Sequence, residues 1–510
     1  MSADASFLLR SRVLESLARH ARERGDAPAL ESPQLCLSYA ELQRAVSELA
    51  REISHHGVRT IGLLTDNGPA WALADLAALA AEVRLVPLPP FFSPQQIAHA
   101  LDSAGVEAVI ADPRLATALR VTAVRSMPLA ALPPDSEPLV WLARAMPETA
   151  ARVPAGTQKI TYTSGTTGAP KGVCLSQLSM EAVAASLREA SGAAPGDRHL
   201  AVLPLATLLE NIGGLYAPLM AGATACLWPM QAVGFNGASG LDPRQLLQAL
   251  SRSRAQTTIL VPQMLQALVE TLEAGPSVPL SLRFIAVGGA TVAPRLLARA
   301  QALGLPVYEG YGLSECASVV ALNRLQAHRA GSVGQPLPHL QVRIAEDGEI
   351  EVAGNRFLGY VGEPALAVDV WLGTGDLGYL DRDGYLHLAG RKKNMFVTAF
   401  GRNVAPEWVE RELCLHPAIA QAAMFGEARP WNAALIVPRP GADAAQIDAA
   451  VEAANRELPD YARVRRWLLA REAFTPANDQ LTANGRLRRA QIRAQYGSAI
   501  DALYLEGTLT

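Results

Sequence analysis

One stretch constrains the fold more than any other, the eleven residues Tyr162 to Gly172, which read Tyr-Thr-Ser-Gly-Thr-Thr-Gly-Ala-Pro-Lys-Gly. They follow a short β-prone run that begins at Gln158. Glycines and small hydroxyl residues let backbone N–H groups surround an anion, and Lys171 can close such a nest as a point charge. The stretch therefore predicts a polyphosphate-binding loop after a strand, the alternative being a polar surface loop. It is not a Walker A motif, because it lacks the Gly-Lys-Ser/Thr ending.

The bulk properties of the chain point to a large globular protein. Its 510 residues exceed what one core accommodates, so we expect two or more domains. Half of the residues are hydrophobic, and the net charge of −3 gives no electrostatic case for nucleic acid. The five cysteines show no CxxC or zinc spacing, which fits a reducing cytoplasm. No signal peptide or transmembrane segment is expected, since charges interrupt the most apolar stretch, residues 70–86.

Lysine is rare in this chain, which makes each lysine informative. Only Lys159, Lys171, Lys392 and Lys393 occur, and the other 41 of the 45 basic residues are arginine. This bias is typical of a GC-rich genome.

The N-terminal 150 residues alternate between helical and strand patterns. A Ser38 cap with Glu41 three residues later predicts a capping box at a helix start. We expect helices at 7–24, 40–55, 69–81 and 94–104, a hairpin at 27–37, strands at 60–65, 84–88 and 108–111, and a connector at 128–147. Apolar strands with helical crossovers favour a parallel sheet covered on both faces.

The same alternation resumes after the glycine-rich loop. We expect helices at 180–190, 208–220, 243–251 and 262–274, and strands at 257–261, 284–287 and 306–309. From residue 333 onward, short strands with Asp-Gly turns predict a small β subdomain, with strands at 342–344, 348–352 and 385–389. From residue 393 onward a smaller α+β unit is expected.

Three further stretches carry residues suited to a nucleotide. The run from Tyr308 to Glu315 combines an aromatic ring with a hydroxyl and a carboxylate, which can stack a base and hold Mg²⁺ on phosphates. The turn that ends at Asp376 places a carboxylate where it can bind ribose hydroxyls, and Gly390-Arg391-Lys392-Lys393 adds a basic cluster. Taken singly, each stretch has an ordinary structural explanation as a turn or a solvated charge run.

Together, in this order and spacing, the four stretches resemble the adenylate-forming superfamily, and most closely the long-chain fatty acyl-CoA ligases. The resemblance covers nearly the whole chain. It implies a large N-terminal AMP-binding domain, residues 1–392, of α/β subdomains and a small β subdomain. A small, mobile α+β domain, residues 393–510, would follow. The implied reaction joins a carboxylic acid to AMP with release of pyrophosphate, and then transfers the acyl group to a thiol. ATP, Mg²⁺ and coenzyme A are the implied cofactors.

The resemblance assigns a role to each motif residue. The phosphates would be bound by Thr163, Ser164, Gly165, Thr166, Thr167, Gly168 and Lys171. Adenine would lie between Gly289-Ala290 and Tyr311-Gly312, with Ser314 on phosphate and Glu315 on Mg²⁺. Asp376 and Arg391 would bind ribose, Lys393 would be the hinge, and Gly401 would line the pantetheine tunnel.

The chain departs from the family pattern at three positions. Where the family carries a catalytic lysine in its last motif, this chain has Arg486, and no lysine follows Lys393. Arginine keeps the charge, but a planar guanidinium does not reproduce an ammonium at a crowded site. Thr207 and Gly373 stand where His is frequent. We expect an active enzyme with a slower or altered adenylation step.

The acid is indicated only by an uncharged expected lining, which favours a medium- or long-chain fatty acid or similar hydrophobic acid. By analogy this lining includes Leu208, Leu209, Gly213, Val261, Met264, Gly288, Gly310, Cys316 and Val319. Glu210 and Asp242 leave an ammonium-bearing acid open. Two alternatives remain: loading of an acyl carrier protein in trans, and a catalytically impaired nucleotide-binding homologue.

Overall fold

The computed structural model describes residues 11–116, 119, 123–128, 133, 136–144, 152–163, 170–236, 240–275, 278–367, 370–482 and 485–505. The chain forms two compact units. The larger comprises residues 1–290, 299–341 and 353–371, and the smaller comprises 291–298, 342–352 and 372–510. The predicted α/β class, with a large unit and a small one, is confirmed.

An eight-stranded sheet in the larger unit carries the glycine-rich stretch. Its order is β21 (Gly359–Tyr360), β9 (Lys171–Ser176), β8 (Thr157–Thr163), β4 (Arg84–Pro87), β3 (Thr60–Leu64), β5 (Ala108–Ala111), β7 (Val140–Arg144) and β6 (Ala123–Pro128). Only the central pairs β8–β4, β4–β3 and β3–β5 are parallel. The prediction of a parallel sheet is therefore right at the centre, and the antiparallel flanks make the sheet mixed. The predicted connector at 128–147 is wrong in part, because β7 pairs there with β5.

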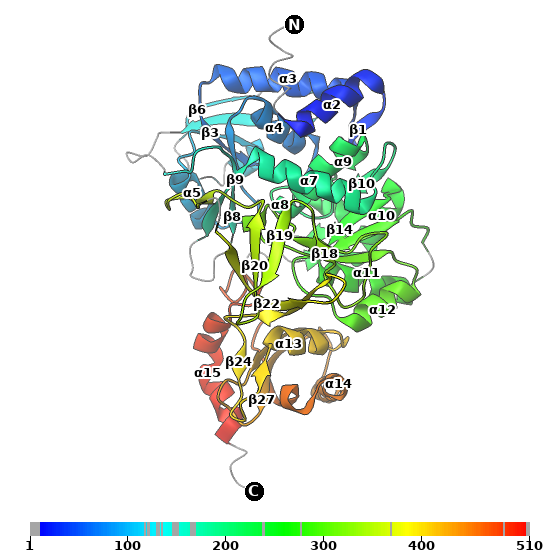
Figure 1. Ribbon diagram of the computed structural model, residues 1–510, viewed down its shortest axis with the longest axis vertical. Helices are drawn as coiled ribbons and strands as arrows, with labels where there is room; N and C mark the ends of the chain where they lie inside the picture. Colours follow the sequence, from blue (N-terminus) through cyan, green and yellow to red (C-terminus); the bar gives the residue numbers. More distant parts are fainter. Residues whose placement is uncertain are drawn as a thin grey trace. The chain divides into compact units, whose positions relative to one another are not determined.

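The described N-terminal residues form four longer helices, of which α4 contacts β3 and β4 of this sheet. They are α2 (Arg12–Glu23), α3 (Tyr39–His55), α4 (Pro69–Ala80) and α5 (Pro94–Ser103), with the short α6 at Pro113–Ala116. Every residue of α4 is buried, as expected of a helix whose one charged residue is Asp75. The helix α3 contacts both α2 and α4 (Figure 1). The predicted capping box is confirmed, with Ser38 and Glu41 exchanging both hydrogen bonds.

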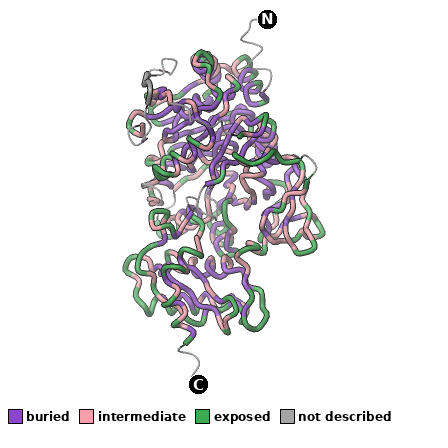
Figure 2. Tube along the Cα trace, turned by 90° about the vertical axis from the view of Figure 1, so that its left-hand side faces the viewer, coloured by how far each residue is buried: buried purple, intermediate pink, exposed green. Residues whose placement is uncertain are grey.

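A nine-stranded sheet forms the second core of the larger unit. Its order is β18 (Gln335–Pro336), β17 (Ala321–Leu322), β16 (Val307–Tyr311), β15 (Phe284–Val287), β14 (Thr257–Leu260), β10 (Arg198–Leu200), β11 (Thr224–Cys226), β1 (Pro28–Glu31) and β2 (Cys36–Ser38). The neighbouring strands β10, β14, β15 and β16 are parallel. Their carboxyl ends consequently share one edge of the sheet. Figure 2 shows buried segments concentrated in the interior of this unit.

The helices beside this sheet include one that differs from its prediction. They are α7 (Gln177–Ser191), α8 (Leu208–Glu210), α9 (Ala217–Ala221), α10 (Pro243–Ser253) and α11 (Pro262–Ala274). The continuous helix predicted for 208–220 is instead interrupted by a π-helix, η1 (Asn211–Tyr216), between α8 and α9. Short or peripheral elements are η2 (Met230–Val233), β12 (Phe235–Asn236), β13 (Gly240–Leu241), α12 (Pro294–Ala302) and η3 (Ser314–Cys316).

A three-stranded sheet between helices forms the core of the smaller unit. It comprises β26 (Ile419–Phe425), β27 (Asn432–Pro438) and β28 (Val464–Leu469). Alternate residues of β27 pack to opposite sides: Ile436 joins the cluster under α13 (Pro406–Cys414) and α14 (Ala444–Glu457), whereas Leu435 joins the cluster under α15 (Arg489–Leu505) (Figure 1). This two-sided burial follows from the two-residue period of a strand.

The remaining strands form a four-stranded sheet and a small hairpin. The sheet has the order β19 (Leu340–Ile344), β20 (Glu349–Gly354), β22 (Leu372–Leu380) and β23 (Leu386–Arg391). The hairpin pairs β24 (Phe396–Val397) with β25 (Asn403–Val404), and η4 (Asp460–Ala462) precedes β28. None of the helices in the described part of the chain combines the length and the apolar character that crossing a bilayer requires.

Candidate active site

The glycine-rich stretch forms the connection of a β-hairpin in the larger unit. Strands β8 and β9 are antiparallel, and their last pair is Thr163 opposite Lys171. The two ends of the predicted phosphate loop are thus fixed side by side by the sheet. The loop residues Ser164, Gly165, Thr166, Thr167 and Gly168 lie outside the described residues. Their phosphate contacts stay a prediction, whereas the strand predicted before them is confirmed.

Lys171 belongs to a cluster that includes the predicted metal-binding carboxylate. Its Nζ lies 4.7 Å from the ring centroid of Tyr360 and 3.5 Å from Oε1 of Glu363. Tyr360 is on β21, which pairs with β9, and its hydroxyl donates a hydrogen bond of 2.8 Å to Glu315 Oε1. Burial, and then the charge of Glu315, raise the pKa of Tyr360, so its phenol stays a donor. The ring of Tyr360 therefore connects the loop lysine to Glu315.

Sequence reasoning missed Tyr360. Nothing near it in the chain resembles a motif, and only the pairing of β21 with β9 brings it to the hairpin. Among the described residues, no group of three or more His, Cys, Asp and Glu side chains is placed to hold a metal ion. A Mg²⁺ ion bound to phosphates takes most of its ligands from phosphate and water, so one carboxylate such as Glu315 suffices to hold it.

The segment that carries Ser314 and Glu315 has a constrained backbone. A Cβ on Gly312 would lie 1.6 Å from the carbonyl oxygen of Ser318, so only glycine fits there. Ala317 and Ser318 have positive φ values of 51° and 97°, which cost free energy in residues with a side chain. Ser314 and Glu315 occupy a 3₁₀ turn, η3, between these positions. Strained backbone positions therefore flank the turn from which Glu315 contacts Tyr360.

The residues predicted to enclose adenine follow two adjacent parallel strands. Gly289 and Ala290 come after β15, and Tyr311 ends β16, with Val287 opposite Glu309. Gly289 has φ +90°, and a Cβ there would lie 3.6 Å from Val261, which follows β14. The carboxyl ends of parallel strands are where α/β folds bind nucleotides. The structure therefore places Gly289, Ala290 and Tyr311 at one sheet edge, and their contact with adenine stays a prediction.

The two predicted ribose-binding residues pair with each other in the smaller unit. Asp376 on β22 lies opposite Arg391 on β23, and Arg391 Nε is 2.8 Å from Asp376 Oδ1. The backbone N–H of Asp376 donates to Thr374 Oγ1, and Gly375 between them has φ +72°. The ion pair fixes the direction of the Asp376 carboxylate, which is nearly buried.

The basic residues after Arg391 differ in their surroundings. Lys392 Nζ donates hydrogen bonds of 2.6 Å to both Asp347 and Glu349, and these two carboxylates raise its pKa. Glu349 also accepts from the backbone of Gly375, which ties the Asp376 turn to Lys392. Lys393, the predicted hinge, is exposed. Gly401 turns the β24–β25 hairpin with φ +73° and an open surrounding, and its role in the pantetheine tunnel stays a prediction.

Arg486 lies on a small turn that backbone hydrogen bonds close. The N–H of Thr482 donates to the carbonyl of Arg486, and the N–H of Arg486 donates to Thr482 Oγ1. Residues 483 and 484 at its tip lie outside the described residues. Behind the turn, Arg489 Nη2 donates to Glu410 Oε2 at 2.5 Å. Burial raises the pKa of Glu410 to about 7, against the lowering effect of Arg489. This supporting pair was not predicted from the sequence.

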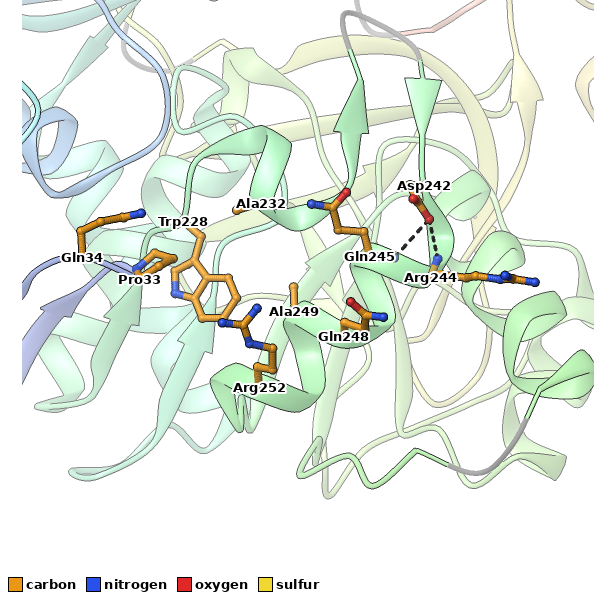
Figure 3. Close-up of a pocket in the computed structure, with 10 residues that line it drawn as sticks. All are labelled: Pro33, Gln34, Trp228, Ala232, Asp242, Arg244, Gln245, Gln248, Ala249 and Arg252. Carbon is orange, nitrogen blue, oxygen red and sulfur yellow. Dashed lines mark hydrogen bonds between the residues drawn. The ribbon is translucent and has the colours of Figure 1, made fainter.

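Glu210 and Asp242 were the two carboxylates that could have bound the ammonium group of an amino-acid substrate. Both are bonded to other groups of the protein. Glu210 is fully buried, with one oxygen 3.0 Å from His199 Nε2 and the other accepting from the backbone of Leu203. Asp242 caps α10 through the N–H groups of Arg244 and Gln245. Asp242 and Trp228 both line a pocket of about 520 Å³, and Figure 3 draws the two hydrogen bonds that Asp242 accepts there. None of the predicted site residues lines that pocket.

The expected acid lining is apolar and closely packed where it is described. Leu208, Met264, Cys316 and Val319 are buried. A Cβ on Gly288 would lie 3.6 Å from the carbonyl oxygen of Gly310 and 3.9 Å from Leu209 Cδ2. Thr207, where His is frequent in the family, donates its hydroxyl to the carbonyl of Pro204.

Comparisons with known proteins match this arrangement. A family model described as AMP-binding enzyme matches residues 17–363, and one described as AMP-binding enzyme C-terminal domain matches residues 393–508. The long-chain-fatty-acid–CoA ligase FadD15 of Mycobacterium tuberculosis is 31% identical over 423 residues, which cover 67% of this chain and 68% of that protein. Feruloyl-CoA synthase from an Amycolatopsis species is 30% identical, over 94% of this chain and 98% of its own.

Solved structures show the same fold. The anthranilate CoA ligase AuaEII in complex with anthranoyl-AMP superposes with a TM-score of 0.78 at 20% identity, over 97% of this chain and 99% of its own. The o-succinylbenzoate CoA synthetase MenE from Bacillus subtilis with its acyl-adenylate gives a TM-score of 0.74 at 24% identity, over 94% and 97% of the two chains. Since the AMP-binding model spans well over half of the residues and its C-terminal partner follows in order, the chain belongs to the AMP-binding enzyme family, the adenylate-forming superfamily.

Proposed function

We propose that this protein activates a hydrophobic carboxylic acid with ATP and then transfers the acyl group to the thiol of coenzyme A. The contact chain from Lys171 through Tyr360 to Glu315 carries the proposal, because it puts a cation and a carboxylate at the base of the predicted phosphate loop. Attack of a carboxylate on the α-phosphorus brings anions together, so positioning and charge neutralisation supply most of the rate enhancement. Pyrophosphate leaves, and the acyl-adenylate is the intermediate.

We assign the nucleotide roles from the family motifs and, for the described residues, from their contacts. Loop residues 163–168 and Lys171 bind the phosphates, Ser314 contacts phosphate, and Glu315 holds Mg²⁺ together with phosphate oxygens. When bound, Mg²⁺ supplies Lewis-acid neutralisation of charge on the phosphates. Adenine lies between Gly289-Ala290 and Tyr311-Gly312 at the strand ends. The Asp376–Arg391 pair presents its carboxylate to the ribose hydroxyls.

The smaller unit contributes the second set of groups. Arg486 carries the positive charge that bridges the attacking carboxylate and the α-phosphate. A small mobile domain begins at Lys393, where the second family model begins, and Lys393 acts as its hinge. In the thioester step Gly401 lines the path of the pantetheine arm, since its surroundings are open. The free state of all five cysteines supports a reducing cytoplasm as the location.

A medium- or long-chain fatty acid is the proposed substrate. Support comes from the apolar lining, from the internal pairing of Glu210 and Asp242, and from the similarity to FadD15. Relatives named for ferulate and indoleacetate make aromatic acids the direct competitors. Loading of an acyl carrier protein in trans is the alternative for the second step. The Arg486 substitution favours one further candidate, an impaired nucleotide-binding homologue.

Pyrophosphate release decides among these candidates. The enzyme is incubated with ATP and Mg²⁺ and one acid at a time, from hexanoate to palmitate, with ferulate, indoleacetate and phenylalanine as competitors. We expect release with the fatty acids and little with phenylalanine. A preference for ferulate or indoleacetate would overturn the fatty-acid assignment. If none of the acids supported pyrophosphate release while ATP binding was measurable, the nucleotide-binding homologue would be favoured. Coenzyme A and a purified carrier protein are then compared as acceptors.

A further inference from the structure

One of the four lysines, Lys159, is buried in the core and has none of the predicted site residues among its hydrogen-bond partners. The side chain of Lys159 on β8 is only 3% exposed. Its Nζ donates to Asp75 Oδ1 at 2.5 Å, to Asn211 Oδ1 at 2.5 Å and to Tyr216 Oη at 3.0 Å. The three N–H bonds of the ammonium thus each have an acceptor. Desolvation lowers the pKa of Lys159, and the charge of Asp75 opposes this effect.

The partners of Lys159 also bind each other, so the cluster is closed. Tyr216 Oη donates to Asp75 Oδ2 at 2.7 Å, and Asn211 Nδ2 donates to the same oxygen at 3.3 Å. Asp75 comes from the buried helix α4, whereas Asn211 and Tyr216 are the first and last residues of the π-helix η1. A buried ion pair contributes little net stability compared with an apolar pair of similar volume. A role in fixing one local conformation is the better explanation for it.

The π-helix is a conformation that needs such support. A π-turn holds one residue more than an α-turn, and it persists only where surrounding contacts hold it. The Lys159 cluster holds η1 at both ends. Between those ends, Gly213 approaches β14 so closely that a Cβ would lie 2.6 Å from Ile259 Cδ1. On Gly214 a Cβ would lie 2.0 Å from Glu210 Oε1.

The segment that η1 positions leads into the expected acid pocket. Leu209 is two residues before η1, and its Cδ2 lies 3.9 Å from the Cβ position of Gly288. On the other side, Lys159 precedes Thr163, the first residue of the predicted phosphate loop, by four residues on β8. The cluster therefore connects the strand that leads into the ATP site with the segment that forms one wall of the acid pocket.

We propose that Lys159 is a specificity-determining positioning residue, which clamps the π-helix through Asp75, Asn211 and Tyr216 and so fixes the acid-pocket wall. The inference rests on the proposed function, and it assigns acid selectivity to a buried pair that touches neither substrate. Without the clamp, η1 moves toward an α-helical register and displaces Leu208 and Leu209. A wall displacement on the scale of one methylene changes selectivity between neighbouring acids about tenfold.

The test uses a variant that removes both charges together. Lys159→Met alone leaves Asp75 as an uncompensated buried carboxylate, so we pair it with Asp75→Asn. Tyr216→Phe is the milder second variant, because it removes one contact and keeps the ring. A matched control, Arg144→Met with Asp102→Asn, removes another ion pair of the larger unit that does not contact η1.

The activity readout compares acid and ATP dependence. We expect the double variant to shift the kcat/KM ratio between neighbouring straight-chain acids about tenfold, while the KM for ATP stays within about twofold. Tyr216→Phe should shift the ratio in the same direction by less, and the control pair should leave it unchanged. The inference would be overturned if the folded double variant kept the wild-type kcat/KM ratio between acids. It would also be overturned if the KM for ATP changed as much as that ratio.

A second readout does not depend on activity. Hydrogen exchange of residues 208–221 is measured in the wild type, the double variant and the control pair. Faster exchange at η1 in the double variant alone supports the clamp, and unchanged exchange overturns it. Two results together would separate the clamp from the proposed function. If no acid supported pyrophosphate release by the wild type, and hydrogen exchange at η1 was still faster in the double variant, the proposed function would fail and the clamp would stand.

Discussion

Two expected phosphate-binding cations, Lys171 in the larger unit and Arg486 in the smaller, are held in different ways. Lys171 ends a strand pair and rests over the ring of Tyr360, which also binds Glu315. Arg486 lies on a turn closed by one backbone hydrogen bond and by one from its N–H to the Thr482 hydroxyl, and a second arginine, Arg489, pairs with Glu410 nearby. Side-chain contacts hold the ammonium of Lys171 in place before substrate arrives, whereas Arg486 lies exposed on its turn. The comparison predicts that the first site tolerates little change in geometry and that the second tolerates exchange of cation type.

The largest effect should come from removing the charge on the turn. We expect Arg486→Ala to raise the activation free energy of adenylate formation by about 2–4 kcal/mol, the scale of losing one preorganised charge. Arg486→Lys should hold or raise that rate, because a compact ammonium approaches both the carboxylate and the α-phosphate more closely. Thioester formation from supplied acyl-adenylate, assayed separately, should change little in either variant. Normal adenylation by Arg486→Ala would make this residue a bystander.

Lys171→Ala should follow in size. Losing one charge-assisted contact to phosphate should raise the free-energy barrier for kcat/KM with ATP by about 1.5–3 kcal/mol. Unlike position 486, this site should not accept the other cation. Lys171→Arg should stay impaired, because a guanidinium stacks flat on the Tyr360 ring and no longer presents a compact charge to the phosphates. Pyrophosphate release at saturating acid is the measurement. A wild-type rate in Lys171→Ala would remove the hairpin from the ATP site.

Asp376→Ala should raise the KM for ATP about fivefold to tenfold, which corresponds to the loss of about one hydrogen bond to ribose. The order of preference among acids should stay the same, since ribose is distant from the acyl tail. Asp376→Asn is the control, because it keeps the size of the side chain and weakens the pairing with Arg391. A change of acid preference as large as the ATP effect would contradict the ribose assignment.

Tyr360→Phe separates the two halves of the Lys171 cluster. The substitution keeps the ring under Lys171 and removes only the hydrogen bond to Glu315. We expect a loss of about fivefold to tenfold in adenylation, the scale of about 1 kcal/mol, with a raised requirement for Mg²⁺. A Mg²⁺ titration of pyrophosphate release tests this. If only the lysine–ring contact mattered, the Mg²⁺ dependence would match the wild type.

Glu410 should give the smallest effect, a dependence of local stability on pH. Its pKa is raised to about 7 in the folded protein from an ordinary value of 4.5, so between these values the folded state binds more protons than the unfolded state. Stability around Glu410 should therefore fall as pH rises from about 5 to about 7.5. Hydrogen exchange in α13, compared between the wild type and Glu410→Gln, reports the change. The variant should show the flatter pH dependence, with Arg489, Glu407 and Cys414 as the neighbouring titratable or charged groups.

How much of this could be predicted from the sequence depends on how local each feature is. The capping box of α3 and the strand before the glycine-rich loop involve neighbours in the chain, and both predictions are confirmed. The helix predicted for 208–220 missed the π-helix, whose end residues Asn211 and Tyr216 both contact Lys159, a residue far earlier in the chain.

Long-range pairing explains the other omissions. Tyr360 reaches Glu315 only because β21 joins the edge of the eight-stranded sheet. Likewise β7 lies within a Pro- and Ala-rich segment, and its strand character comes from pairing with β5. Asp376 and Arg391 were each predicted to bind ribose, but their mutual ion pair depends on the register of β22 against β23. Register is a property of the sheet, so neither local sequence alone specifies it.

Two glycines beside the proposed active site leave very different routes open to evolution. Position 312 admits no other residue, because the carbonyl oxygen of Ser318 already occupies the place of a Cβ. A methyl group at position 288 would make only ordinary contacts with Gly310 and Leu209, and the backbone there is not in a left-handed conformation. An alanine at position 288 would therefore narrow the expected acid pocket without straining the backbone there. During evolution, substitution of Gly288 would change the preference among acid substrates while Gly312 stays unchanged.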